Sequence, residues 1–295
     1  MSKIQEALKK LQKNGLGPAN GKPSSGGGRR LPETVIPIAR RKKVEIAGAK
    51  FHLDEQELIR GGLLAPLDQA IPVGDEFRRI KRPLIENALQ KGIAQDEYMN
   101  LILVTSPMPG AGKTFCSMNL AASISLERDL NVLLVDADVA KPHISTAFEL
   151  RDRPGLLDIL ADETLSIEDI LVRTDLNDIQ VLPAGTEHSQ STELLASERM
   201  EHVMHELARR YDDRIIIMDS PPLLITSEAQ ALSKQAGQIA LVVESGRTTN
   251  QEIQETLEIL DRDKAINLIL NKSVYSQKGG YYGGYYGYSD FSADT

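Results

Sequence analysis

The feature that most constrains the fold of this chain is a series of short apolar runs that alternate with helical segments. The runs predict strands over residues 101–106, 132–138, 179–185, 214–220, 239–245 and 266–272. The segments between them predict helices near 113–127, 155–161, 197–211, 227–236 and 249–261. The runs are continuously rich in Val, Ile and Leu, which is typical of strands buried on both faces. We therefore expect an α/β fold with a mostly parallel central sheet flanked by helices.

A glycine-rich turn follows the first predicted strand, in the sequence LILVTSPMPGAGKT, and a helix follows the turn. This order suits a phosphate-binding loop, because glycines let backbone N–H groups converge on phosphate oxygens at a helix N-terminus. Lys113 is expected to neutralise phosphate charge and the Thr114 hydroxyl to ligate Mg²⁺. The predicted nucleotide-binding residues of the loop are Pro109, Gly110, Ala111, Gly112, Lys113, Thr114 and Phe115. Pro107 stands where the usual spacing has glycine, so a chance glycine-rich turn is the alternative for this motif taken alone.

Acidic residues end two further predicted strands. Asp136 and Asp138 close VLLVDAD, and Asp219 closes RIIIMDS. Ligands of open α/β sheets bind outside the carboxyl ends of the strands. A single acid there is commonly a helix N-cap. Three acids after a phosphate loop instead indicate bound ATP and Mg²⁺, because Mg²⁺ combines one or two carboxylates with phosphate and water oxygens.

The composition indicates the kind of cellular compartment in which the chain works. The one cysteine, Cys116, cannot form an internal disulfide and suits a reducing environment. No apolar run approaches the ~18 residues of a membrane span, and the first residues lack the apolar block of a secretory signal. We expect a soluble, cytoplasmic protein.

Both ends of the chain lack the pattern of a packed core. Residues 1–14 predict an amphipathic helix, 15–70 a flexible basic linker with a weakly patterned segment, and 71–274 the folded domain. Residues 275–295 predict a disordered Gly/Tyr-rich tail. Residues 1–45 hold eleven Lys/Arg against three Glu, although the whole chain carries a net charge of −8. Such an arm can bind an anionic surface or simply be a solvated linker, and we expect no nucleic acid as a partner.

The chain contains three motifs at these positions, SPMPGAGKT, VDADVAKP and MDSPP. Together they resemble the motifs of the bacterial tyrosine kinases of exopolysaccharide assembly, in particular the exosortase-associated autokinases. The resemblance covers about residues 75–290 and implies a P-loop NTPase-like fold. It implies that Lys113, Asp136 and Asp138 are catalytic, with Asp136 as the base that accepts the tyrosine proton. It also implies that Thr114, Asp138 and Asp219 hold Mg²⁺. One departure is Ala140, where the family often has Arg.

The resemblance extends to assembly and partners. Glu76, Arg79 and Arg82 match the helix through which family members form homo-oligomeric rings, and Asn271 stands where related ATPases contact adenine. Members without a membrane span work with a membrane adaptor of the chain-length-determinant type. The resemblance therefore implies a location at the inner membrane through that partner, and a tyrosine phosphatase that acts on the kinase.

The tail supplies candidate phosphoacceptors, which are Tyr275, Tyr281, Tyr282, Tyr285, Tyr286 and Tyr288. Neighbouring glycines keep their hydroxyls accessible. A sticky tract without phosphorylation is the alternative for this segment. For the whole chain, the alternative is a partition or septum-placement ATPase that switches without kinase activity. Those ATPases usually carry a second lysine early in the phosphate loop, where this chain has Met108.

Overall fold

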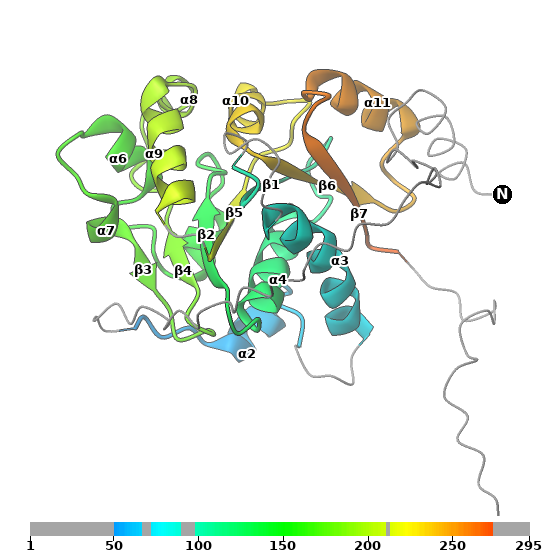
Figure 1. Cartoon of the computed structure of the whole chain (residues 1–295), viewed down its shortest axis with the longest axis horizontal. Helices are drawn as coiled ribbons and strands as arrows, with labels where there is room; N and C mark the ends of the chain where they lie inside the picture. The colour runs from blue at the N-terminus through cyan, green and yellow to red at the C-terminus, as the bar shows by residue number, and fades with distance from the viewer. Residues whose placement is uncertain (1–49, 67–71, 90–97, 211–212, 274–295) are drawn as a thin grey trace, which may run out of the picture.

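The computed structural model describes residues 50–66, 72–89, 98–210 and 213–273 (Figure 1). Its centre is a seven-stranded sheet with the order β3-β4-β2-β5-β1-β6-β7. The strands are β1 (Leu101–Thr105), β2 (Asn131–Asp136), β3 (Val172–Arg173), β4 (Gln180–Leu182), β5 (Arg214–Asp219), β6 (Gln238–Glu244) and β7 (Ala265–Asn271). All neighbours pair in parallel except β3 and β4, which are antiparallel. The predicted mostly parallel sheet is confirmed.

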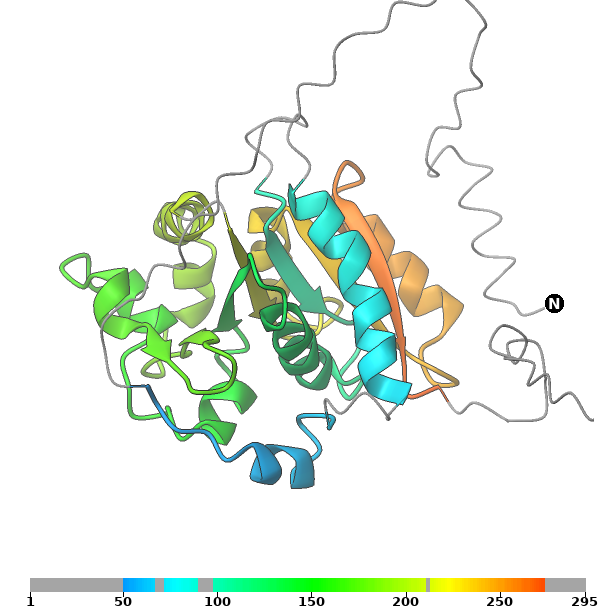
Figure 2. The same cartoon turned by 60° about the horizontal axis from the view of Figure 1, so that its bottom comes forward.

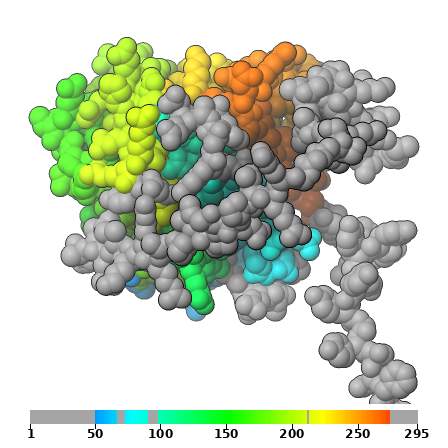
Figure 3. Space-filling model, in the orientation of Figure 1, coloured from blue at the N-terminus to red at the C-terminus, as the bar shows by residue number. Residues whose placement is uncertain are grey.

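Helices cover both faces of the sheet. Their bounds are α2 (Glu55–Arg60), α3 (Pro72–Leu89), α4 (Lys113–Ser125), α5 (His143–Ala147), α6 (Leu156–Ala161), α7 (Ile167–Ile170), α8 (Ser191–Leu195), α9 (Glu198–Arg209), α10 (Ser227–Gln235) and α11 (Asn250–Ile259). Figures 1 and 2 show α3 and α4 side by side on one face. In the space-filling view, α9 (yellow-green) lies at the surface to the left of α10, and α11 (orange) to its right (Figure 3).

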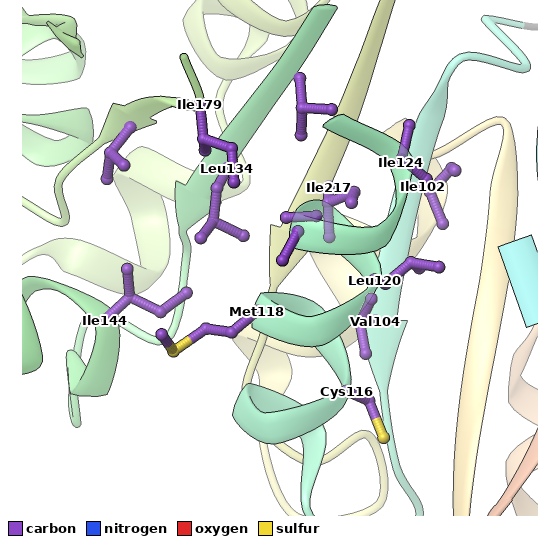
Figure 4. Packing of buried hydrophobic residues seen from close by; sticks show 14 of the residues in the cluster. Ile102, Val104, Cys116, Met118, Leu120, Ile124, Leu134, Ile144, Ile179 and Ile217 are labelled. Carbon is purple, nitrogen blue, oxygen red and sulfur yellow. The ribbon is translucent and has the colours of Figure 1, made fainter. Parts of the chain in front are cut away.

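The sheet divides the hydrophobic core into clusters on its two faces. Ile102 and Val104 of β1 belong to the cluster under α4, whereas Leu101 and Leu103 belong to the cluster under α9 and α10. Successive side chains of a strand point to opposite faces, so an unbroken apolar run is buried on both. Figure 4 shows side chains of α4, including Leu120, packed beside Val104. This packing holds the first turn of α4 at the carboxyl end of β1.

The segment before α3 adds to the folded unit. Leu53, Leu58 and Leu64 are buried in the same cluster as α4. The backbone N–H of Phe51 donates to the carbonyl oxygen of Arg173 on β3 at 2.7 Å. The folded unit therefore begins before residue 71, where the prediction had placed its start, and residues 50–66 show no clear pattern that would indicate this. The predicted helix of residues 1–14 and the predicted tail lie outside the described residues.

The predicted elements are present, with ends that differ from the prediction by up to three residues: most elements end earlier, while β2, β6 and β7 also begin one residue earlier. The short helices α2, α5, α7 and α8 and the two-residue strand β3 were not predicted, because segments of two to six residues show no clear periodicity. Within the described ranges, no helix is both long and apolar enough to cross a membrane.

Candidate nucleotide-binding site

The loop between β1 and α4 has the backbone of an anion-binding turn. Gly110 and Gly112 have φ of 86° and 92°, a conformation that favours glycine. Gly112 is the N-cap of α4 and no side chain caps the helix. The N–H groups of the first turn therefore remain available to a ligand, where the helix dipole favours negative charge.

A buried carboxylate lies behind this turn. The hydroxyl of Thr114 donates to Asp219 Oδ2 at 2.7 Å, and that of Ser117 donates to Asp219 Oδ1 at 2.9 Å. Asp219 is 1% exposed. Burial raises its pKa to about 6, although both hydroxyl bonds act in the opposite direction. The end of β5 is thus tied to the first turn of α4.

Asp136 is the second buried carboxylate. It lies opposite Asp219 in the parallel register of β2 and β5. Its Oδ2 accepts from both the backbone N–H and the hydroxyl of Ser145, each at 2.7 Å, while its buried Oδ1 has no partner among the described residues. Burial, and next the charge of Asp219, raise the pKa of Asp136 to about 7.

Lys113 and Asp138 add opposite charges to the same edge. Burial lowers the pKa of Lys113, while the carboxylates of Asp219 and Asp138 raise it. Burial also raises the pKa of Asp138, against the positive charge of Lys113. Both side chains are largely buried. A charged nucleotide would therefore meet a lysine and three acids that are already removed from water.

The end of β7 closes the loop from its other side. Asn271 Nδ2 donates to the carbonyl oxygen of Ala111 at 2.8 Å, and Lys272 Nζ donates to that of Gly110 at 2.6 Å. Lys272 also pairs with Glu244 at 3.2 Å. Asn271 thus supports the phosphate loop, and its contact with adenine stays a prediction.

The structure brings most of the predicted residues together at the carboxyl edge of β1, β2 and β5. Pro109 is exposed in the loop. The ring of Phe115 packs edge-on against Phe77 of α3, with centroids 5.9 Å apart, so its side chain serves packing. The six tail tyrosines lie outside the described residues.

Three residues of the site were not predicted from the sequence: Ser117, Ser145 and Lys272. Ser117 could have been found, because it follows Thr114 by three positions and so shares its helix face. Ser145 could not, since α5 was not predicted. Lys272 gave no signal beyond its place after a strand.

The residues present fit Mg²⁺. Thr114, Asp138 and Asp219 offer oxygen atoms, which Mg²⁺ prefers. In the ranges that the structure describes, no three His, Cys, Asp or Glu side chains form a closed metal cage. An open set of donors is expected where phosphate and water oxygens complete the coordination.

Comparison with known proteins agrees with this geometry. A model of the AAA domain matches residues 99–274, more than half of the chain. The tyrosine-protein kinase YwqD of Bacillus subtilis is 33% identical over 197 residues, which cover 66% of this chain and 81% of YwqD. The chain belongs to the bacterial tyrosine-protein kinase family. The tyrosine-protein kinase Wzc of Salmonella typhimurium is 30% identical over 268 residues, 90% of this chain.

Comparison with solved structures indicates the same family. The BceF tyrosine kinase domain superposes with a TM-score of 0.58 at 28% identity, covering 74% of this chain and 86% of that domain. The cell division ATPase MinD of Pyrococcus furiosus reaches 0.50 at 23% identity, covering 57% of this chain and 70% of MinD, and shows a shared fold alone. The chain spans 35% of the length of Wzc and 24% of the length of the tyrosine-protein kinase Ptk of Acinetobacter johnsonii.

The predicted assembly helix has one face exposed to solvent. On α3, Glu76, Arg79 and Arg82 are exposed, whereas Phe77 and Leu84 are buried in the core. None of the three charged side chains has an ion pair within the described residues. They are therefore available for contact with another chain.

Proposed function

We propose that the chain is an ATP-dependent protein-tyrosine autokinase that phosphorylates the tyrosines of its tail in trans, within an oligomer. The observation that carries the proposal is Asp136, a buried carboxylate at the nucleotide edge. Its Oδ1 has no hydrogen-bond partner among the described residues, and burial raises its pKa to about 7. A general base works best when its pKa lies near the operating pH. A nucleotide switch that only hydrolyses ATP does not need a tyrosine-rich acceptor.

The chain's own residues supply the steps of transfer. The phosphate loop and Lys113 hold the β- and γ-phosphates and offset their charge. Asp136 Oδ1 accepts the proton of the attacking phenol. The phenol oxygen then forms a bond to the γ-phosphorus as the bond to the β-phosphate oxygen breaks, which leaves ADP and a phosphotyrosine.

Magnesium belongs to the same proposal. Thr114, Asp138 and Asp219 would hold it, and the bound ion neutralises charge on the β- and γ-phosphate oxygens. The hydrogen bond from Thr114 to Asp219 holds the hydroxyl group next to the carboxylate. The oxygen-rich donor set supports this assignment.

Partners and location follow from the proposed activity. We infer a homo-oligomeric ring through the exposed charges of α3, a membrane adaptor of the chain-length-determinant type and a tyrosine phosphatase. With the adaptor, the kinase would work at the inner membrane in exopolysaccharide production, as its exosortase-associated resemblance indicates.

Incubation of the purified chain with Mg²⁺-ATP, followed by a phosphotyrosine blot, tests the proposal. We expect signal from the full chain and none from Lys113→Met, from Asp136→Asn or from a chain that ends at Val274. ATP hydrolysis without phosphotyrosine in the full chain would instead favour a partition-type ATPase.

A further inference from the structure

The strand β7 forms one edge of the sheet and leaves part of its apolar surface uncovered. Leu268 and Leu270 are 44% and 49% exposed. They lie two residues apart in the strand, so both point to the same face of the sheet. Within the described ranges β7 pairs with β6 alone, and its seven residues include neither a charged residue nor proline. Folded proteins usually protect such an edge with charge, proline or a covering segment.

The two exposed leucines, here called the β7 patch, continue a buried apolar layer. Leu268 is in register with Leu241 of β6, and Leu270 is in register with Val243. Leu241 and Val243 are buried in the cluster against which Leu257 of α11 packs. Figures 1 and 2 show β7 beside α11 at the rim of the sheet. The layer therefore ends in two side chains that no described segment buries.

The segment beside the β7 patch is acidic. Residues 250–263, which form α11 and the turn after it, contain five Asp or Glu and one Arg. Glu255, Glu258 and Asp261 are exposed. Complementary charge selects partners and excludes wrong ones. The occupant that fits this surface carries apolar side chains with positive charge beside them.

The first fourteen residues of the chain have this composition. Ile4, Leu8 and Leu11 recur at positions i, i+4 and i+7, the spacing at which an amphipathic helix places its apolar anchors in a groove. Residues 1–14 also contain four Lys and one Glu. Their charge is thus opposite to that of residues 250–263.

The length of chain between the two surfaces matches the distance between them. The described structure begins at Lys50, and Phe51 bridges to Thr174 next to β3, at the opposite edge of the sheet. The edges of a seven-stranded sheet are about 29 Å apart at about 4.8 Å per strand. A flexible linker as long as residues 15–49 has a root-mean-square length of about 33 Å. Effective concentration is highest when the length of the linker matches the span.

We propose that the β7 patch is the docking site for residues 1–14 of the same chain. The three apolar side chains of this segment pack on Leu268 and Leu270, and its lysines face the acidic segment of α11. The inference goes beyond the proposed kinase function and does not depend on it. Asn271, which supports the phosphate loop, directly follows Leu270. The docked segment would therefore support the strand that holds the loop.

A single tryptophan in the full chain tests the proposal. The chain contains no Trp, so Leu8→Trp introduces one reporter on the docking face of the arm. Its emission maximum and its quenching by acrylamide measure its burial. Leu268→Asp in this parent alters the patch, and Leu126→Asp, at a residue 52% exposed at the end of α4, is the matched control. Glu258→Lys is a second variant, at an exposed position of α11 that leaves the packing of β7 unaltered.

We expect blue-shifted emission and weak quenching from the parent. Leu268→Asp should lose the blue shift and reach the quenching constant that the same chain shows in urea, whereas Leu126→Asp should match the parent. Glu258→Lys should increase quenching, and so should high salt in the parent, because salt screens exposed charges.

Three results would overturn the proposal. The first is a parent whose tryptophan is already as exposed as in urea. The second is equal quenching in the parent and in Leu268→Asp where both melt at the same temperature. If Leu268→Asp does not fold, equal quenching in the parent and Glu258→Lys at low salt decides in the same way. The third is a blue shift that disappears on dilution, which would assign the docked segment to a second copy.

Discussion

Asn271 at the end of β7 donates its side-chain amide to the carbonyl oxygen of Ala111, 2.8 Å away and 160 residues earlier in the chain. The bond joins the last strand to the phosphate loop. It fixes a carbonyl group between two glycines of positive φ, Gly110 and Gly112. The loop is therefore held by a distant strand as well as by its own backbone.

Asn271→Ala should weaken nucleotide binding. A neutral hydrogen bond contributes about 1 kcal/mol, so we expect the Kd for ATP to rise by about fivefold. Calorimetric titration with Mg²⁺-ATP measures the change. Asn250→Ala, at an exposed position of α11, is the control and should bind normally. Equal affinity in the two variants would show that the Ala111 carbonyl does not need this support.

Gly112→Ala should weaken nucleotide binding at least as much as Asn271→Ala does. A Cβ at residue 112 would lie 2.2 Å from Asn271 Nδ2, and φ of 92° is strained for alanine. Gly246→Ala is a matched control, because Gly246 also has positive φ but nothing lies within 4 Å of its Cβ. Both variants carry the strain and only one carries the clash.

We expect Gly246→Ala to lose some thermal stability and to keep its affinity for ATP. In the same calorimetric titration, the Kd of Gly112→Ala for ATP should rise. Binding by Gly112→Ala as tight as that of the unaltered chain would contradict the loop geometry. A parallel thermal melt separates loss of affinity from loss of the fold.

The central strands and the phosphate loop were predictable because their signals are local. The continuous apolar run at residues 101–105 is buried on both faces, and the glycine turn follows directly. By contrast, the bond of Asn271 to Ala111 and that of Ser145 to Asp136 depend on where separate segments come to lie. No spacing in the sequence encodes such contacts.

The predicted start of the folded unit, at residue 71, was too late for a related reason. Leu53, Leu58 and Leu64 are buried, yet they belong to a six-residue helix and its flanks, too short to show a period. Their burial comes from the surface that α4 and its neighbours offer. Short elements of this kind are decided by tertiary contacts rather than by propensity.

The stability of the nucleotide-free, magnesium-free protein should fall as pH rises through the range from about 4 to about 7. An unfolded aspartate has a pKa near 3.9, whereas burial raises that of folded Asp136 to about 7. In that window the folded state holds a proton that the unfolded state has released, so raising the pH favours unfolding. Asp219, with a pKa of about 6, acts in the same direction.

Asp136→Asn removes the buried charge and should therefore stabilise the protein at pH 8, on the order of a few kcal/mol, and by less at pH 5. Thermal unfolding at both pH values measures the difference. Asp162→Asn is the control, since Asp162 is exposed and its hydrogen bonds with Thr164 lower its pKa. An identical gain at pH 5 and pH 8 would assign the effect to packing rather than to charge.

The exposed charges of α3 should govern assembly rather than folding. Glu76, Arg79 and Arg82 recur every three residues on the solvent side of the helix, while Phe77 and Leu84 hold the opposite side in the core. Replacing the three charged residues with Ala removes groups that make no ion pair within the described ranges. Surface changes of this kind alter stability by only about 0.5 kcal/mol.

We therefore expect the triple variant to melt close to the unaltered chain and to sediment as smaller species at the same concentration. High salt should reproduce the change in the unaltered chain, because exposed charge pairs are screened. Three substitutions to Ala on α11, at Gln254, Glu255 and Glu258, give an equally altered exposed surface and should leave sedimentation unchanged. Loss of assembly in both variants would mean that total surface charge, and not the α3 pattern, holds the subunits together.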